Sequence, residues 1–304
     1  MEKRKIRWHI AIFLAPAVLI YSALMIFPLF GTLNLSFYDK VDQEQVFVGL
    51  DNFRLLFGNE RWSDSFWNAF KNNVWFFVVH MLVQNPIGVM LAAILSSQVV
   101  RFSAFFRTTF FIPTILSFVI VGFAWKLILS PIWGIAPDLL DAVGLKSLFA
   151  PYLGLESTAL TTLALISVWQ FVGIPMMLIY ASLLSIPEEV LEAAECDGIT
   201  GFNAFWKIKL PLIWPSIGII SILTFVGNFN SFDLIYTTQG GLAGPNFSTD
   251  VLGSLLYRTF FGFQTQIGDI NMGATLSVIM FGIILAGVSF YLFLIQSRMR
   301  RYQF

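Results

Sequence analysis

Charged residues are scarce in this sequence: Asp, Glu, Lys and Arg make up 12% of its 304 residues, whereas hydrophobic residues make up 57%. Soluble domains carry roughly 25% charged residues. With about half that share of charge, the composition predicts a protein that is surrounded mainly by lipid. The formal net charge is zero, which gives no indication of a nucleic-acid partner.

Residues that bind metals or phosphates are also rare. The one cysteine, Cys196, excludes an internal disulfide and a multi-cysteine metal site, and the two histidines, His9 and His80, are far apart. No glycine is followed by lysine, so the phosphate-binding loop Gly-x-x-x-x-Gly-Lys-Ser/Thr is absent. We therefore expect no metal site, no catalytic residue and no cofactor bound by this chain.

Long segments without charge are plentiful. A helix that crosses the hydrocarbon core needs about 20 mainly apolar residues. Six windows free of Asp, Glu, Lys and Arg approach or exceed this length, and the one near residues 108–125 is the shortest. They predict an all-α polytopic membrane protein, a single domain over 1–304, with six transmembrane helices at about 10–36, 74–98, 106–128, 158–184, 210–234 and 270–296.

The distribution of Lys and Arg predicts the orientation of these spans. Cytoplasmic loops are enriched in Lys and Arg. Cytoplasmic N- and C-termini place eleven of the 18 basic residues inside: Lys3, Arg4, Lys5, Arg7, Arg101, Arg107, Lys207, Lys209, Arg298, Arg300 and Arg301. The first apolar stretch exceeds the roughly 7–15 residues of a signal-peptide core, so we expect an uncleaved first helix.

The largest cytoplasmic loop in this topology, 185–211, has the pattern of a helical hairpin. Ser185 and Glu188 have the spacing of a capping box, and Gly198 is placed to end the first helix. Thr200 is placed to cap a second short helix over 201–208. We expect Ala193 and Ala194 to form a small, exposed corner. By helix physics alone, the hairpin could be a docking surface or a simple connection between two spans.

A resemblance favours the docking surface. Glu192-Ala193-Ala194, followed by Asp197-Gly198 and by Ile-Lys-Leu-Pro at 208–211, resembles the EAA loop of binding-protein-dependent ABC (ATP-binding cassette) importers. Other segments resemble the carbohydrate branch of this family, the maltose-type and glycerol-phosphate-type permeases: 48–53, 229–236, 238–241 and 272–277. The stretch 242–245 departs from the compact turn that is typical of this branch.

The resemblance implies a type I importer permease fold in a bacterial cytoplasmic (inner) membrane. It implies a second permease subunit, in this branch usually a different six-span chain, and two copies of a cytoplasmic ABC ATPase that bind ATP and Mg. It also implies an external substrate-binding protein that docks on loops 39–73 and 233–269. In this family the EAA loop couples the permease to the ATPase, which gives that role to Glu192, Ala193, Ala194, Asp197 and Gly198.

Polar residues inside the spans suggest where a sugar passes, because such residues usually face the bundle interior or a water-filled cavity. Similarity to the maltose-type relatives implies a substrate pathway along Trp169, Gly173, Met176, Thr224, Asn228 and Ser231. Helix-to-helix hydrogen bonding is the alternative role for the polar members of this set. We expect Gln84 and Asn85 to repair the helix beside Pro86, and His80 to be an interior residue with satisfied hydrogen bonds.

Three other functions are the alternatives to a sugar importer, and each would require particular features in the sequence. An ABC permease for a non-carbohydrate solute would share the EAA loop. An ATP-independent secondary transporter would be expected to show inverted repeats or carboxylates at mid-membrane, and neither is present in the sequence. A membrane-embedded enzyme would need a nucleophile–base pair or a metal cluster. The sequence identifies neither the sugar nor whether the partner permease is identical.

Overall fold

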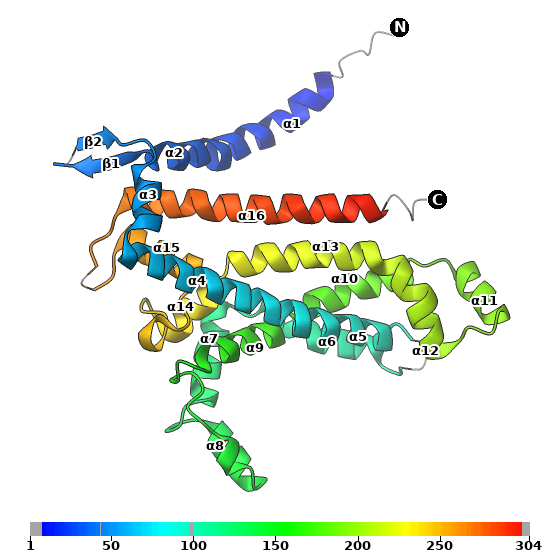
Figure 1. Ribbon diagram of the computed structural model, residues 1–304. Coiled ribbons are helices and arrows are strands. Elements are labelled where there is room, and N and C mark those ends of the chain that lie inside the picture. Colours follow the sequence, from blue (N-terminus) through cyan, green and yellow to red (C-terminus); the bar gives the residue numbers. More distant parts are fainter. Residues whose placement is uncertain (1–7, 43, 98–99, 265, 300–304) are drawn as a thin grey trace. The chain divides into compact units, whose positions relative to one another are not determined.

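The computed structural model describes residues 8–42, 44–97, 100–264 and 266–299, with side chains described from Ile12 to Phe293 outside these gaps (Figure 1). The chain divides into two compact units. One contains the residues up to Ser63 together with Leu256–Phe281, and the other contains Asp64–Leu255 together with the residues from Gly282 onward. Of the basic residues that predicted the orientation, seven lie outside the described side chains: Lys3, Arg4, Lys5, Arg7, Arg298, Arg300 and Arg301.

The first unit begins with a continuous apolar helix and then forms a small sheet. Its elements are α1 (Trp8–Tyr21), η1 (Ser22–Ile26), α2 (Phe27–Leu35), β1 (Tyr38–Val41), β2 (Glu44–Phe47) and α3 (Asp51–Gly58), joined by parts of α15 (Leu252–Phe261) and α16 (Ile270–Met299). The strands are antiparallel, with Tyr38 opposite Phe47 and their rings in edge contact at 5.4 Å. The prediction of an all-α protein is therefore wrong at 38–47, where aromatic and β-branched residues pair across the strands.

Two buried asparagines hold the end of α2 in the first unit. Asn52 Nδ2 donates to the carbonyls of Ser36 and Tyr38 at 3.1 and 2.8 Å. Asn271 Nδ2 reaches the Tyr38 carbonyl at 2.8 Å and Gln45 Oε1 at 2.9 Å. The last carbonyls of a helix lack partners within the helix, so these amides complete the hydrogen bonds where α2 ends and the β-hairpin begins.

The second unit is a bundle of helices that are broken at several points. Its elements are α4 (Glu60–Val79), η2 (His80–Gln84), α5 (Asn85–Leu95), α6 (Ser103–Phe111), η3 (Ile112–Ile115), α7 (Phe118–Ile128), α8 (Ile135–Ala142), η4 (Lys146–Leu148), α9 (Ala159–Phe171), α10 (Gly173–Leu184), α11 (Glu188–Cys196), α12 (Gly201–Ala204), η5 (Phe205–Lys209), α13 (Leu210–Phe229), α14 (Asp233–Gln239) and η6 (Pro245–Phe247).

Among the described residues, four helices are long and apolar enough to cross a membrane, or six if each of two bent pairs counts as one span. The four are Ile12–Leu35, Glu60–Leu95, Gly201–Phe229 and Ile270–Phe293. They correspond to the predicted spans 10–36, 74–98, 210–234 and 270–296. The helix that corresponds to the predicted span 210–234 begins at Gly201 and ends at Phe229.

The two bent pairs correspond to the predicted spans 106–128 and 158–184. Ala159–Phe171 and Gly173–Leu184 meet at 41°, close to Pro175, which has no N–H to donate to the preceding turn. Ser103–Ile115 and Phe118–Ile128 meet at 98°. The sequence did not predict this bend, because an uncharged window gives the length of an apolar segment but not its direction.

Side-chain hydrogen bonds support the sharper bend. Gln170 Nε2 donates to the carbonyl of Leu116 at 3.0 Å, and Thr114 Oγ1 donates to the carbonyl of Gln170 at 3.0 Å. Ser117 then caps α7 by accepting the N–H of Ile120 at 3.3 Å. The backbone groups released by the bend thus find partners without water.

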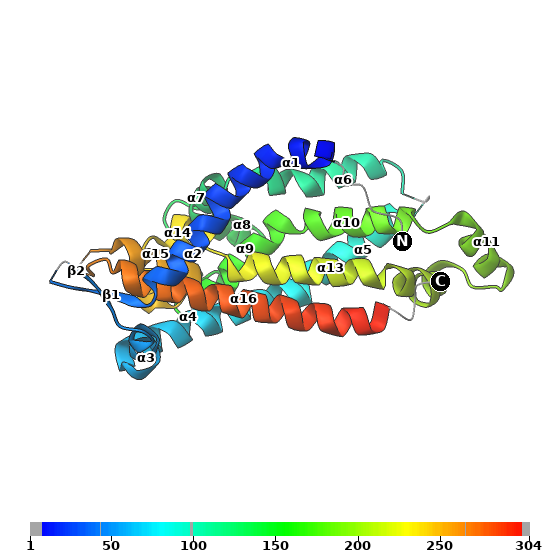
Figure 2. The ribbon, with the colours of Figure 1, turned by 90° about the horizontal axis from the view of Figure 1, so that it is seen from above.

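One hydrophobic core of the second unit lies where α5, α10 and α13 run side by side (Figure 2). The buried side chains that pack there are Ala92, Leu95, Met176, Ile179, Leu183, Ile213 and Ile220. Close approach of α5 to α10 depends on Gly88: a Cβ at this position would lie 2.9 Å from the Pro175 ring and 3.1 Å from the backbone nitrogen of Met176.

We therefore expect Gly88→Ala to destabilise the protein by about 1–3 kcal/mol, as overpacking does. Gly282→Ala is the matched control, since a Cβ on this glycine of α16 meets nothing within 4 Å. The melting temperature of the purified protein in detergent measures both effects. Equal melting temperatures for the two variants would contradict this description of the α5–α10 contact.

Candidate functional site

The hairpin formed by α11 and α12 contains the EAA-loop residues. Glu192, Ala193, Asp197 and Gly198 are exposed, whereas Ala194 is 5% exposed. The expectation of an exposed Ala193-Ala194 corner is therefore wrong for Ala194. This side chain lies against the groove between the hairpin and α5, so only Ala193 of the pair is available to a partner on the outside.

Backbone hydrogen bonds end α11 at Gly198 as predicted. Gly198 has φ +75°, its N–H donates to the carbonyl of Glu195 at 2.9 Å, and the N–H of Ile199 donates to the carbonyl of Ala194 at 2.8 Å. This pair of bonds is the Schellman motif, which favours glycine at the left-handed position. The sharp turn after the helix is therefore fixed by the backbone itself.

The predicted side-chain caps of the hairpin do not form. Pro187 occupies the N-cap of α11, and Ser185 Oγ donates back to the carbonyl of Ser182 at 2.8 Å. Thr200 occupies the N-cap of α12, but its side chain makes no capping hydrogen bond. The prediction of a separate helix over 201–208 is also wrong, because α12, η5 and α13 are one continuous helix from Gly201 to Phe229.

The hairpin is strongly acidic. Five exposed carboxylates lie on α11 or at its end: Glu188, Glu189, Glu192, Glu195 and Asp197. None of them forms an ion pair with another residue in the described part of the chain. The hairpin thus presents unpaired negative charge and a continuous helix that leads from it into the bundle.

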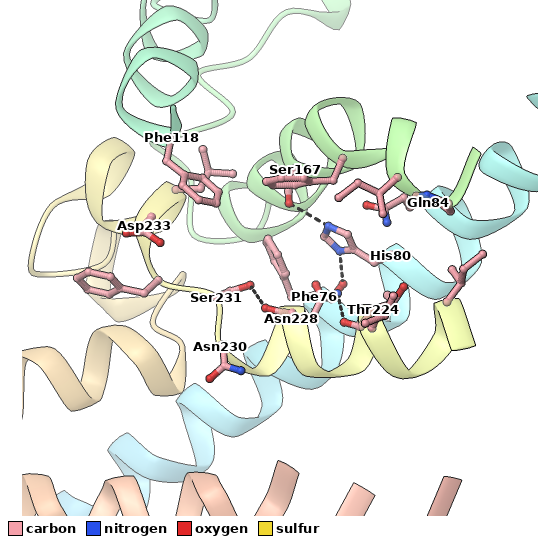
Figure 3. A pocket seen from close by; sticks show the side chains of 18 of the residues that line it. Phe76, His80, Gln84, Phe118, Ser167, Thr224, Asn228, Asn230, Ser231 and Asp233 are labelled. Atoms are coloured by element: carbon pink, nitrogen blue, oxygen red, sulfur yellow. Dashed lines mark hydrogen bonds between the residues drawn. The ribbon is translucent and has the colours of Figure 1, made fainter. Parts of the chain in front are cut away.

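A second feature is a cavity of about 280 Å³ between α4–η2, α9–α10 and the α13–α14 junction (Figure 3). Phe76, Phe118 and Phe171 contribute aromatic rings to its lining. Of the residues predicted along the substrate pathway, Thr224, Asn228 and Ser231 line it. Ser231 lies beyond the end of α13 rather than on the same helical face, since Asn230 is the C-cap of that helix.

The three predicted residues of the fourth span lie elsewhere. Trp169 is half-exposed and contacts Trp125 edge-on at 5.5 Å. Gly173 packs against η3 and α6, where a Cβ would lie 2.7 Å from the carbonyl oxygen of Phe110. Met176 is fully buried in the core with α5. The cavity-lining residues of α9 and α10 are Ser167, Phe171, Ile174, Pro175 and Leu178. The first three have the predicted spacing but come two positions earlier.

Two amide oxygens in the cavity wall have no hydrogen-bond partner. Gln84 and Asn228 are 6% and 5% exposed, and Gln84 Oε1 and Asn228 Oδ1 are buried without a donor. A buried acceptor without a partner costs about 1–3 kcal/mol. Both oxygens could accept hydrogen bonds from hydroxyl groups that enter the cavity.

His80 is a satisfied interior residue, which confirms the prediction. Its Nδ1 lies 2.8 Å from the carbonyl of Phe76 and its Nε2 lies 3.0 Å from Ser167 Oγ. Because a carbonyl can only accept, Nδ1 carries the proton and Nε2 accepts from the serine hydroxyl. The ring is therefore held in one tautomer.

Asn85 does not repair the helix, contrary to prediction. It exchanges two hydrogen bonds with Thr224 of α13, at 3.1 and 3.2 Å, and the turn before Pro86 is the π-helix η2. Thr224 therefore has a helix-to-helix role in addition to its place in the cavity wall.

Asn73 is a residue of this site that the sequence did not indicate. It is fully buried, its Nδ2 donates to the carbonyl of Asn228 at 2.8 Å, and its Oδ1 accepts the N–H of Leu252 at 2.7 Å. Asn72, beside it, donates to the carbonyls of Ser248 and Asp250 at 3.1 and 2.7 Å. These amides tie the loop after α14 to α4 and to the end of α13.

We expect Asn73→Leu to destabilise this region, because the buried N–H of Leu252 would lose its partner at about 1–3 kcal/mol, and the carbonyl of Asn228 would keep only the N–H of Ser231. Asn68→Leu is the control, since Asn68 makes one exposed hydrogen bond, to the carbonyl of Phe247 at 2.9 Å. Limited proteolysis of the 240–252 loop reports the difference. Cleavage of the Asn73 variant no faster than that of the Asn68 variant would contradict the assignment.

Within the described residues, no group of three or more His, Cys, Asp or Glu side chains is arranged to hold a metal ion. The two polar features are therefore the acidic hairpin and the cavity with two open acceptors. In the cavity wall, Ser167 Oγ lies 3.0 Å from His80 Nε2, so a hydroxyl is hydrogen-bonded to an imidazole there. Both features are suited to binding.

Comparison with known proteins places these features in a family. Residues 84–301 match the family model described as "Binding-protein-dependent transport system inner membrane component". The chain is 33% identical to the probable ABC transporter permease protein YurN of Bacillus subtilis (strain 168), over 88% of this chain and 92% of the relative. It is 29% identical to the lactose transport system permease protein LacF of Rhizobium radiobacter, over 92% of each chain.

The fold is also similar to a solved one. A permease chain in the crystal structure of a bacterial alginate ABC transporter, in complex with an alginate pentasaccharide-bound periplasmic protein, superposes with a TM-score of 0.78 at 21% identity, covering 93% of this chain and 92% of that one. The chain therefore belongs to the family of inner membrane components of binding-protein-dependent transport systems, the transmembrane permeases of ABC importers, and its relatives include sugar permeases.

Proposed function

We propose that this chain forms half of the translocation pathway of an ATP-driven sugar importer, with its α11–α12 hairpin docked on a separate ATPase. The observation that carries the proposal is the hairpin: an acidic helix that contains Glu192-Ala193-Ala194 and is ended at Gly198 by a Schellman motif. A hairpin that only connected two spans would not need this combination of exposed charge and rigid turn.

The hairpin can transmit force because of its connections. It continues without a break through η5 into α13, and α10 enters it from the other side. ATP binding would draw the two ATPase subunits together and carry the hairpin with them, which would tilt α10 and α13 and change the side on which the pathway opens. Glu192 offers a charge-assisted contact to a basic group of the ATPase.

The proposed assembly contains a second permease subunit, two ATPase subunits and an external substrate-binding protein. The family description and the similarity to the alginate importer support it. The chain would lie in a bacterial cytoplasmic membrane with both termini inside, so that the hairpin meets the ATPase. The loops 39–73 and 233–269 would then face the binding protein.

The cavity is the proposed point of contact between this chain and the sugar. Gln84 Oε1 and Asn228 Oδ1 are open acceptors for sugar hydroxyls, and Phe76, Phe118 and Phe171 provide aromatic surface. Sugar hydroxyls are hydrogen-bond donors, and sugar rings have apolar C–H faces. The relative named as a lactose permease supports this class of solute.

Gly198→Val tests the coupling role. Valine at φ +75° is strained and should distort the turn, because β-branched residues rarely adopt this conformation. We expect the variant to insert normally into the membrane but to lose uptake. Each 1.4 kcal/mol of free energy lost from docking on the ATPase should lower uptake about tenfold. Uptake by the reconstituted transporter and ATPase activity should be measured together.

Gly144→Val is a close control. Gly144 has φ +73° and also ends a helix, α8, with the same two hydrogen bonds, and a Cβ on either glycine meets nothing within 4 Å. It should retain uptake. If Gly198→Val retains full uptake, or if both variants lose it equally, the hairpin is not the coupling element.

Asn228→Leu tests the cavity. The Asn228 side chain donates only to the carbonyl of Thr224 in its own helix, at 2.7 Å, so its replacement should leave the melting temperature nearly unchanged. Loss of an acceptor for a sugar hydroxyl should raise the activation free energy of uptake by about 1–3 kcal/mol. Uptake should then be roughly five- to 150-fold slower. Unchanged uptake at saturating and at low sugar would exclude Asn228 from the pathway.

A further inference from the structure

The segment between α7 and α9 exposes a large apolar surface. In residues 131–149, which we name the α8 arm, every residue is exposed or half-exposed and none is buried. The most exposed apolar side chains are Trp133 at 81%, Ile132 at 79% and Val143 at 66%. Exposed apolar surface of this kind normally marks an interaction site.

The apolar residues of the arm lie on one side of its helix. Ile135, Leu139 and Val143 follow each other at intervals of four, so they form a stripe along α8 and its C-cap. By the same periodicity, Asp141 lies on the opposite side of the helix, and Asp138, three residues after Ile135, lies at the edge of the stripe. The helix is therefore amphipathic, with an acidic face and an apolar face.

The direction of the arm follows from the bend before α7. Ser103–Ile115 runs alongside α10, and α7 turns from it by 98°. Figure 1 shows that α7 and α8 leave the bundle of α9, α10 and α13 sideways, at the end opposite to α11. A segment that runs across membrane-spanning helices at their ends runs along the plane of the membrane surface.

The helix before the arm, α7, also exposes apolar side chains. Ile120, Phe123 and Leu127 are 59%, 63% and 44% exposed, and Ile132 and Trp133 come at the start of the arm. In a transmembrane protein, exposed apolar side chains at the ends of the spans are placed to meet the boundary between lipid headgroups and acyl chains. Tryptophan is enriched at that depth.

The charges of the arm fit a boundary position. Lys146 Nζ lies 2.9 Å from Asp141 Oδ2, with both side chains more than half exposed. The hydrogen bond from Lys146 to Asp141 raises the pKa of Lys146, so the lysine stays protonated. The arm has no net positive charge, because its charged residues are Asp138, Asp141 and Lys146. Anionic lipids therefore offer it no electrostatic attraction.

We propose that the α8 arm is an interfacial membrane anchor: α8 lies flat in the outer leaflet, with Ile135, Leu139 and Val143 toward the acyl chains and its carboxylates toward water. The partner is the lipid surface itself, and electrically neutral lipid suffices. The anchor fixes the outer ends of α7 and α9 in the membrane plane. This role is independent of the sugar and of the ATPase contact.

Spin-label accessibility tests the anchor in the assembled transporter. Cys196→Ser removes the one native thiol, and a nitroxide is attached at Leu139→Cys or, as the matched control one residue away, at Asp138→Cys. The protein is reconstituted in phosphatidylcholine vesicles, with or without phosphatidylglycerol. Collisions with O₂, which concentrates in lipid, are compared with collisions with a water-soluble nickel chelate.

We expect the ratio of O₂ to nickel collisions to be several-fold higher at Leu139 than at Asp138, and the same in both lipid mixtures. A label at Val143→Cys should behave like that at Leu139, so one poorly folded variant does not decide the result. Equal ratios at Leu139 and Asp138 would overturn the proposal. Shielding of Leu139 from both reagents would also overturn it, because a protein would then cover the face.

Discussion

Backbone groups at helix breaks must find hydrogen-bond partners in a medium that offers no water, and buried amide side chains meet this need at the bend before α7 and at two helix ends. Gln170 donates to the Leu116 carbonyl at the bend before α7, Asn73 binds the end of α13, and Asn52 and Asn271 bind the end of α2. These side-chain hydrogen bonds fix the angle between the helices on either side. The helices can then move as rigid segments.

The second unit contains two different sites, the cavity and the α11–α12 hairpin, and each is held by different hydrogen bonds. Around the cavity, side-chain amides fix the backbone while Gln84 Oε1 and Asn228 Oδ1 are left without donors, so the wall is rigid and can accept new hydrogen bonds. At the other end, the hairpin is held by its own backbone bonds at Gly198, and its five carboxylates are unpaired in the described chain. A rigid acidic projection of this kind is suited to a basic socket, and the continuous helix from Gly201 to Phe229 connects it to the cavity wall.

The sequence predicted features that depend on neighbouring residues. The end of α11 at Gly198, the start of α3 at Asp51 and most of the apolar segments follow from local patterns. The sequence did not predict the 98° bend, because its cause includes Gln170, 54 residues from Leu116. It placed the fourth-span pathway residues two positions away from the cavity face, since α9 and α10 are apolar all round and give no facing signal. Asn73 was missed because its partner Leu252 is 179 residues away.

The central claim is that the α11–α12 hairpin faces the cytoplasm and meets the ATPase, and Cys196 gives direct access to it. This residue is the chain's one cysteine and is exposed on α11. Its reaction with a membrane-impermeant maleimide should be measured in inside-out and right-side-out vesicles, with and without the ATPase subunit. We predict labelling in inside-out vesicles that bound ATPase suppresses. Labelling in right-side-out vesicles, or labelling that ATPase leaves unchanged, would contradict the account.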